Sequence, residues 1–136
     1  MVKDHGRSRI SFAGDVVQVD GRRPKYVAEA RRNAQLASAA LSRVAGVSIP
    51  VMPVLALAGN GVISFYGPPR GCIVTSYREL AGVLRSRGRR LAQPTVEKLY
   101  TLARQPNTWV NPRYVPLVDR YRWYPEGIGS TDKTSA

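Results

Sequence analysis

Arginines are the residue type in this sequence whose number and spacing best suit a chemical role. Arg85, Arg87, Arg89 and Arg90 fall within one stretch of six positions. A basic stretch of this kind can grip the phosphates of a nucleic acid. As the solvated end of a helix, the same arginines would instead complement the helix dipole. The pattern alone leaves both uses open.

Two further arginines extend the candidate nucleic-acid-binding set. Arg31 and Arg32 fall on the outward faces of a helix that the sequence predicts over residues 26–44. The whole chain shares this bias, with 21 Lys and Arg against 9 Asp and Glu and a formal charge of +12. Such an excess favours a polyanionic partner, with nucleic acid first and an anionic membrane surface second. The alternative is a basic surface that serves only solubility.

Residues suited to catalysis are sparse. His5 is the only histidine, which excludes His-based triads and zinc sites with several histidines, and we expect it to be exposed. Asp15 and Asp20 stand where turns are predicted and are better explained as turn formers than as metal ligands. Glu29 precedes Arg32 by one helical turn, so we expect an ion pair between them. No metal site is predicted from these residues.

The single cysteine and the ends of the chain bear on the compartment. Cys72 lies in an apolar context, so we expect a buried thiol, no intrachain disulfide and a reducing cytoplasm. Residues 1–11 have no apolar segment typical of a signal peptide, and no apolar run approaches the length of a membrane span. The sequence therefore predicts a cytoplasmic protein without a membrane partner.

The helix over residues 26–44 is the element that the rest of the chain is expected to surround. Apolar residues recur along it at steps of three and four, which places them on one side. They are Val27, Ala30, Ala34, Ala37, Leu41 and Val44. Most are alanines, so another layer can approach closely. Pro24 suits the first turn, and Gly46 suits the left-handed residue that ends a helix.

Strands and two shorter helices complete an α/β pattern. Strands are predicted at 9–12, 16–19, 54–58, 62–66 and 72–75, of which 54–58 and 72–75 are of the buried type. Ser76 and Glu79 form a capping-box pattern before a helix that should turn Leu80, Val83 and Leu84 inward. Pro94 opens a last helix, with Val96, Leu99, Tyr100 and Ala103 on its apolar side. Strands separated by helices predict an α/β fold.

We place one domain over residues 1–110 and a basic aromatic tail over residues 111–136. The tail interleaves Arg113, Arg120 and Arg122 with Tyr114, Tyr121, Trp123 and Tyr124. Such a composition can stack on bases, and it can equally dock on a protein core. From Gly127 onward the tail has little to bury, so its end is expected to be disordered.

The order of several segments over about residues 2–109 resembles the later part of a NERD (nuclease-related) domain. These segments are a strand ending in Lys3, VDGRR at 19–23, the Ala- and Arg-rich helix, PVMPV at 50–54, VTSYREL at 74–80 and RQPNTW at 104–109. The NERD family is similar in fold to restriction-endonuclease-like nucleases of the PD-(D/E)XK type. The resemblance therefore implies a mixed sheet flanked by helices.

The resemblance also implies a site, of which this chain carries little. In the family a Glu on an N-terminal helix, an Asp on a strand and an acid-X-Lys motif would hold Mg²⁺ and orient the attacking water. Lys3 matches the Lys of that motif, but Met1 stands where the acid should be. Asp4 would point to the opposite side of the strand. We therefore expect an N-terminally truncated, catalytically incomplete NERD-like domain that contacts DNA and holds no cofactor as it stands.

Two rival hypotheses remain. A sheet that lacks its first strands has an exposed edge, so the chain could be an interaction module that completes its sheet with a partner chain or a second copy. It could also be a metal-dependent nuclease whose acids are supplied upstream or by a partner.

Overall fold

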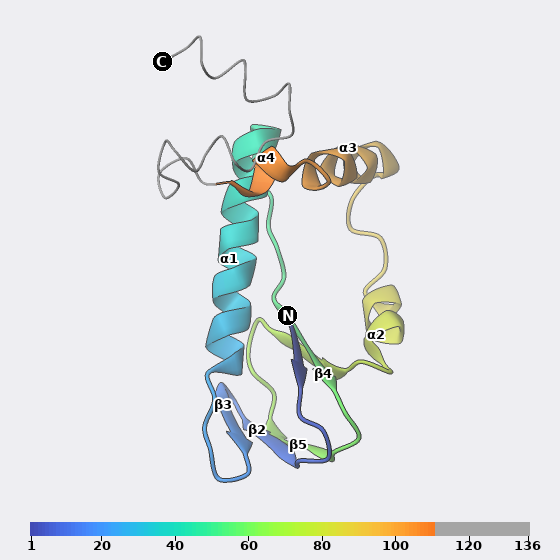
Figure 1. The fold of residues 1–136 in the computed structure, drawn as a ribbon. Helices are drawn as coiled ribbons and strands as arrows, with labels where there is room; N and C mark the ends of the chain where they lie inside the picture. The colour runs from blue at the N-terminus through green and yellow to red at the C-terminus, as the bar shows by residue number, and fades with distance from the viewer. Residues whose placement is uncertain (111–136) are drawn as a thin grey trace. The chain divides into compact units, whose positions relative to one another are not determined.

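The computed structural model describes residues 1–110; residues 111–136, where the basic aromatic tail is predicted, lie outside the described part. Ten elements follow one another along the described chain (Figure 1). They are β1 (Val2–Asp4), β2 (Ile10–Ala13), β3 (Val16–Val19), α1 (Tyr26–Ala45), β4 (Val54–Ala58), β5 (Ile63–Gly67), β6 (Ile73–Ser76), α2 (Leu80–Ser86), α3 (Gln93–Ala103) and α4 (Pro106–Trp109).

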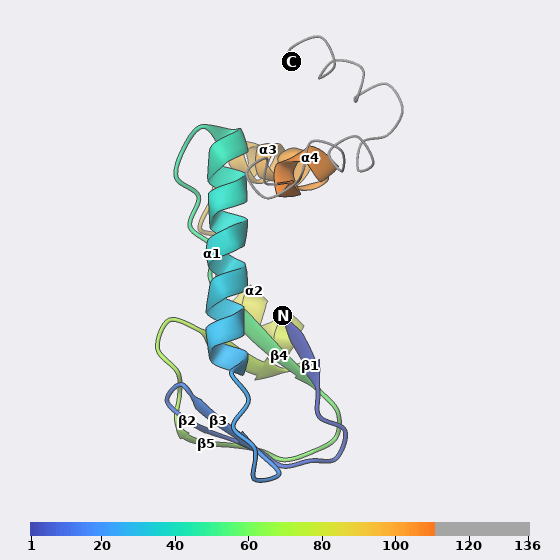
Figure 2. The ribbon, with the colours of Figure 1, turned by 60° about the vertical axis from the view of Figure 1, so that its left-hand side comes forward.

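The first sheet is parallel and has the order β1-β4-β6. β4 is its central strand and lies beside β1 (Figure 2). In the register of the two strands, Val2 is opposite Ala56. The strand predicted at 54–58 forms β4, and its central residues Leu55, Ala56 and Leu57 are almost inaccessible to solvent. A strand covered on both faces needs such a run, so its prediction as a buried strand is confirmed.

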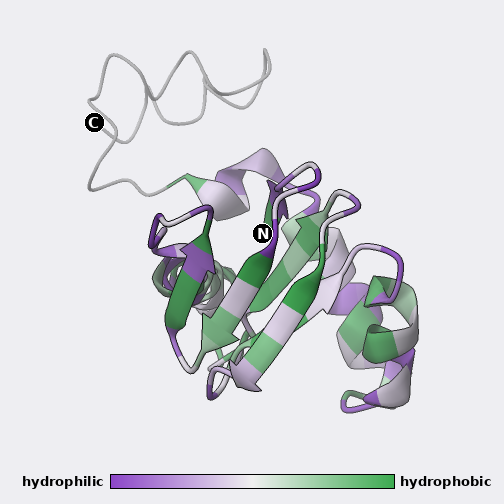
Figure 3. Ribbon diagram, turned by 90° about the horizontal axis from the view of Figure 1, so that it is seen from below, coloured by the Kyte–Doolittle hydropathy of each residue, from purple (hydrophilic) through white to green (hydrophobic). Residues whose placement is uncertain are grey.

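The second sheet has the order β3-β2-β5. β2 and β3 correspond to the strands predicted at 9–12 and 16–19 and form an antiparallel hairpin, and Gly14 in its turn has a φ of +58°. β5 then pairs with β2 in parallel. The predicted α/β class is confirmed, and the strands divide between two small sheets. In Figure 3 the strands are mostly hydrophobic and the joining loops mostly hydrophilic.

The first half of α1 packs on residues from both sheets. Val27 and Ala30 belong to the same buried cluster as Phe12 of β2 and Leu57 of β4. The Phe12 ring also stacks on Phe65, with 5.3 Å between the ring centroids. The small side chain of Ala30 allows the strands to approach α1 closely, as the alanines on this side of the helix predict. This packing fixes which side chains of α1 lie near the strands.

Contacts along the chain divide it into two compact units. One combines Met1–Leu36 with Pro50–Arg90, and the other combines Ala37–Ile49 with the described residues from Leu91 to Val110. In the second unit, Arg43 donates hydrogen bonds to the carbonyl oxygens of Thr108 (2.9 Å) and Val110 (3.0 Å). α1 ends as predicted, with Gly46 at a φ of +73°.

The two predicted shorter helices form where expected, as α2 and α3, but neither is packed deeply. Neither α2 nor α3 contains a buried residue, and Leu84 of α2 is half exposed. Of the capping box, only the bond from the Glu79 amide to the Ser76 hydroxyl is present, at 3.3 Å, and the helix begins later, at Leu80. The inward orientation predicted for the apolar residues of α2 is therefore wrong for Leu84, whereas Leu80 and Val83 are half-buried.

Candidate nucleic-acid interface

The cluster of arginines in the sequence falls at the end of α2. Arg85 lies in the last turn of the helix, and Arg87, Arg89 and Arg90 follow it, with Gly88 in a left-handed conformation between them. All four side chains are exposed. Within residues 1–110, the ion pairs are Lys3–Glu29 and Arg31–Asp15, so none of these four arginines has a carboxylate partner there. Their positive charge is uncompensated by the described part of the chain.

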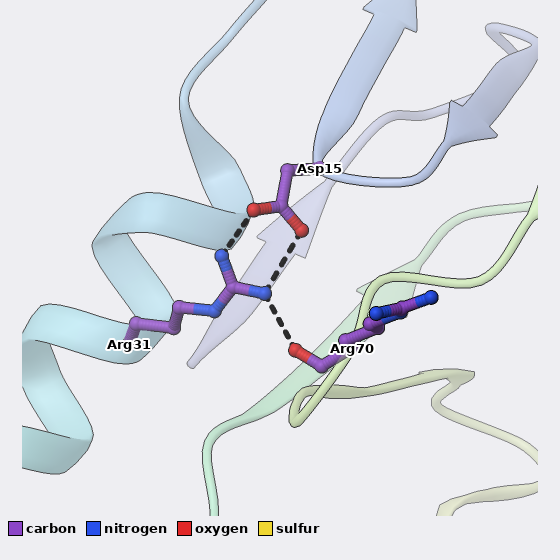
Figure 4. Close-up of polar contacts among 3 residues, drawn as sticks. All are labelled: Asp15, Arg31 and Arg70. Carbon is purple, nitrogen blue, oxygen red and sulfur yellow. Dashed lines mark hydrogen bonds and ion pairs between the residues drawn. The ribbon is translucent and has the colours of Figure 1, made fainter.

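Arg31 is placed differently from this cluster. Its guanidinium donates to both carboxylate oxygens of Asp15, and Nη2 also donates to the carbonyl oxygen of Arg70 at 2.5 Å (Figure 4). The hydrogen bonds from Arg31 hold the pKa of the Asp15 carboxyl below its usual range. Arg31 thus joins α1 to the β2–β3 turn and to the loop before β6. Arg32, its neighbour, is exposed and has no such contact among the described residues.

Lys3 lies in the middle of β1 and faces α1. Its Nζ atom is 2.8 Å from Oε2 of Glu29 and 5.1 Å from the centroid of the Tyr26 ring. The hydrogen bond from Lys3 to Glu29 raises the pKa of the lysine. Glu29 therefore pairs with a strand residue, and the predicted pair with Arg32 is wrong. Tyr26 and Glu29 are three positions apart on α1, so both reach the same side chain.

The described residues do not supply the ligand set that the resemblance implies for Mg²⁺. Glu29 is engaged by Lys3, and Oδ1 of Asp4 accepts a hydrogen bond from the Gly6 amide at 2.9 Å. Within residues 1–110, no group of three or more His, Cys, Asp or Glu side chains is placed to hold a metal ion. Mg²⁺ binds through several oxygen ligands, so Lys3 and Asp4 alone do not fit it.

His5 is buried, so the prediction that its side chain is exposed is wrong. The side chain is 8% exposed, and neither ring nitrogen has a hydrogen-bond partner among the described residues. The loop after β1 packs closely against the loop after β4. A Cβ atom at Gly61 would lie 2.9 Å from Cδ2 of His5 and 1.9 Å from the carbonyl oxygen of Ser8. This close approach of two backbones, which the sequence pattern does not report, encloses the imidazole.

No sequence pattern singles out Arg78, although its guanidinium has defined partners in the structure. Arg78 follows β6, and its Nη2 donates to Oδ1 of Asn60, which follows β4, at 2.9 Å. Its Nε donates to the hydroxyl of Tyr77 at 3.0 Å, and its guanidinium lies 5.5 Å from the centroid of that ring. The signal that could have found it is positional, since the carboxyl ends of parallel strands meet at one edge of a sheet.

Comparisons with known proteins identify no relative of this chain. No protein-family model, curated protein or solved structure matches the chain. In the part of the chain that the structure describes, no helix is both long enough and apolar enough to cross a membrane.

Proposed function

We propose that this protein binds nucleic acid, with DNA as the first candidate, through the phosphate backbone and without sequence preference. The observation that carries the proposal is the set of exposed arginines after β6 without carboxylate partners in residues 1–110. They are Arg85, Arg87, Arg89 and Arg90. Uncompensated guanidinium groups attract phosphates and release the counterions condensed on the nucleic acid.

Arg32 is a further exposed arginine that the proposal assigns to binding, whereas Arg31 is given a structural role. The guanidinium of Arg31 already donates to Asp15 and to the Arg70 carbonyl. The resemblance to NERD domains supports the same class of partner. In this reading the described chain is a nuclease-related module without a complete hydrolytic site, because Lys3 is paired with Glu29 rather than placed among metal-binding carboxylates.

The test is a salt titration of binding to a fluorescent DNA duplex of random sequence, followed by anisotropy. The four arginines from Arg85 to Arg90 are replaced together by Gln, and a matched variant carries Lys at the same positions. Each phosphate contact contributes about 0.9 to the slope of log affinity against log salt. The Gln variant should therefore bind more weakly with a flatter slope, while the Lys variant keeps most of the slope. Equal slopes in the wild-type chain and the Gln variant would assign the arginines to solubility.

Hydrolysis is tested separately. Plasmid DNA incubated with the protein and Mg²⁺ or Mn²⁺ should stay supercoiled, since phosphodiester hydrolysis in this family depends on carboxylates that hold the metal. Nicking that survives repurification and is lost in a Lys3→Ala variant would favour the alternative, a nuclease whose acids come from outside residues 1–110.

A second candidate function is that of an interaction module, favoured by the edges of the first sheet. β1 and β6 are the outer strands of that sheet in the described residues, and Val2 on β1 is 65% exposed. An open strand edge can pair with another chain. Sedimentation velocity over a range of protein concentrations tests this candidate. Self-association together with no affinity for DNA would support it against the first proposal.

A further inference from the structure

Arg78 differs from the arginines at positions 85–90 because its side chain is held by two neutral side chains. Oδ1 of Asn60 accepts from Nη2, and the Tyr77 hydroxyl accepts from Nε. Neither partner carries a charge that cancels that of the guanidinium. The side chain is exposed, and its Nη1 group has no hydrogen-bond partner among the described residues. A planar cation is thus oriented with free donors toward solvent.

The backbone around Asn60 is itself closely fixed. The Asn60 amide donates to the carbonyl oxygen of Gly6 at 2.7 Å, and the Gly61 amide donates to the same oxygen at 3.2 Å. A Cβ atom at Gly59 would lie 2.4 Å from that oxygen, so only glycine allows the two loops to approach this closely. The partner that orients Arg78 therefore rests on a rigid junction between the loops after β1 and β4.

These residues lie at one edge of the parallel sheet. Gly6 follows β1, Asn60 follows β4 and Arg78 follows β6, and the three strands run in the same direction. Ligands of open α/β sheets bind beyond the carboxyl ends of the strands. An arginine with a preset orientation suits a phosphate group in particular, because its planar fork can donate two parallel hydrogen bonds to two phosphate oxygens.

We propose that Arg78, oriented by Asn60 and Tyr77, is a fixed contact for a backbone phosphate of the bound nucleic acid. This inference rests on the function proposed above and gives that surface one defined contact. The arginines at positions 85–90 supply charge at the end of α2 without such partners, whereas Arg78 supplies a fixed geometry. Its contribution to affinity should exceed that of one unit of net charge.

Three variants that lower the net charge by the same single unit test the proposal. Arg78→Ala removes the contact, and Asn60→Asp keeps the shape of the orienting side chain but places a carboxylate against the guanidinium. Arg23→Ala removes an exposed arginine for which no contact is described, and serves as the control. Affinity for the fluorescent duplex is measured for each at one salt concentration, and thermal unfolding confirms that each variant is folded.

Arg78→Ala and Asn60→Asp should each weaken binding about tenfold, as expected for the loss of one charge-assisted hydrogen-bonded contact. Arg23→Ala should weaken it by less than about twofold. In the Arg78→Ala background, Asn60→Asp should have little further effect, because the guanidinium that it neutralises is gone. Equal losses in all three single variants would overturn the role of Arg78 and leave nucleic-acid binding intact. A wild-type chain that does not bind DNA would overturn both proposals.

Discussion

α1 and α2 both carry apolar residues that the sequence predicts to face inward, but only the first half of α1 contains fully buried ones. In α1, Val27 and Ala30 are 1% and 2% exposed. In α2, Leu84 is 50% exposed and no residue is buried. The same helical spacing therefore has two outcomes in one chain.

The difference teaches what hydrophobic spacing does and does not report. Spacing gives the face of a helix on which apolar side chains gather. Whether that face is covered depends on the layers around it, and α1 packs among strands of both sheets. α2 has only 7 residues, about two turns, so its stripe has little area to bury. Three predictions test this contrast.

The largest expected effect concerns the layer beneath α1. Leu57→Ala removes a fully buried side chain of β4 that lies in the same cluster as Val27. We expect the free energy of unfolding to fall by about 2–5 kcal/mol, because a cavity remains where the side chain was. Leu84→Ala in α2 makes the same chemical change at a half-exposed site, and its loss should stay within about 0.5 kcal/mol. Urea denaturation followed by circular dichroism measures both, and similar losses would contradict the contrast.

An intermediate effect is expected from two glycine substitutions. A Cβ atom at Gly61 would lie 1.9 Å from the Ser8 carbonyl oxygen, which is backbone and cannot turn aside. Gly61→Ala should therefore lower the free energy of unfolding by about 1–3 kcal/mol, or more if the loops separate. Gly82 of α2 has nothing within 4 Å of the position of a Cβ atom. Gly82→Ala should be stabilising by about 0.5–1 kcal/mol, because alanine favours a helix. Thermal melts that show the opposite ranking would refute the close junction of the two loops.

The smallest expected effect is on the pH dependence of stability. It should change when Arg31 of α1 is replaced and stay unchanged when Arg85 of α2 is replaced. Arg31 lowers the pKa of Asp15 in the folded state. The contribution of this pair is therefore complete above the unfolded pKa of aspartate, about 3.9, and is lost as the pH falls through the lower folded pKa. Arg31→Ala should be less stable than the wild-type chain at neutral pH, and the difference should shrink on acidification below about pH 4. Arg85→Ala should follow the wild-type curve throughout, since Arg85 has no carboxylate partner in residues 1–110. A constant difference between Arg31→Ala and wild type at all pH values would exclude the ion pair as its cause.

The local elements could be predicted from the sequence, because they depend on short-range patterns. Both strands of the β2–β3 hairpin, the long helix α1 and the buried strand β4 follow from alternation, helical spacing and glycine in turns. The α/β class follows from their order. The resemblance to NERD domains and the binding of nucleic acid stay predictions.

Contacts between distant segments could not be predicted in the same way. The burial of His5 depends on Gly61, more than fifty positions later, and on a backbone approach that no pattern reports. Glu29 forms its ion pair with Lys3 of β1. Helical spacing alone instead favours Arg32 as the partner of Glu29. Arg78 becomes a candidate site only when β4 and β6 are seen to end at the same edge. Each of these facts depends on the topology of the parallel strands.

The parallel pairing also sets an order of events during synthesis of the protein. Val2 pairs with Ala56 and Ile10 with Ile63, so β1 and β2 emerge from the ribosome well before their parallel partners β4 and β5. At about 5–20 residues per second, that interval is roughly 3–10 seconds. Phe12 and Val17 are cross-strand partners in the hairpin and need no later segment to meet. The hairpin can therefore form early and shield part of its own apolar surface, while β1 has to wait for β4 to be made.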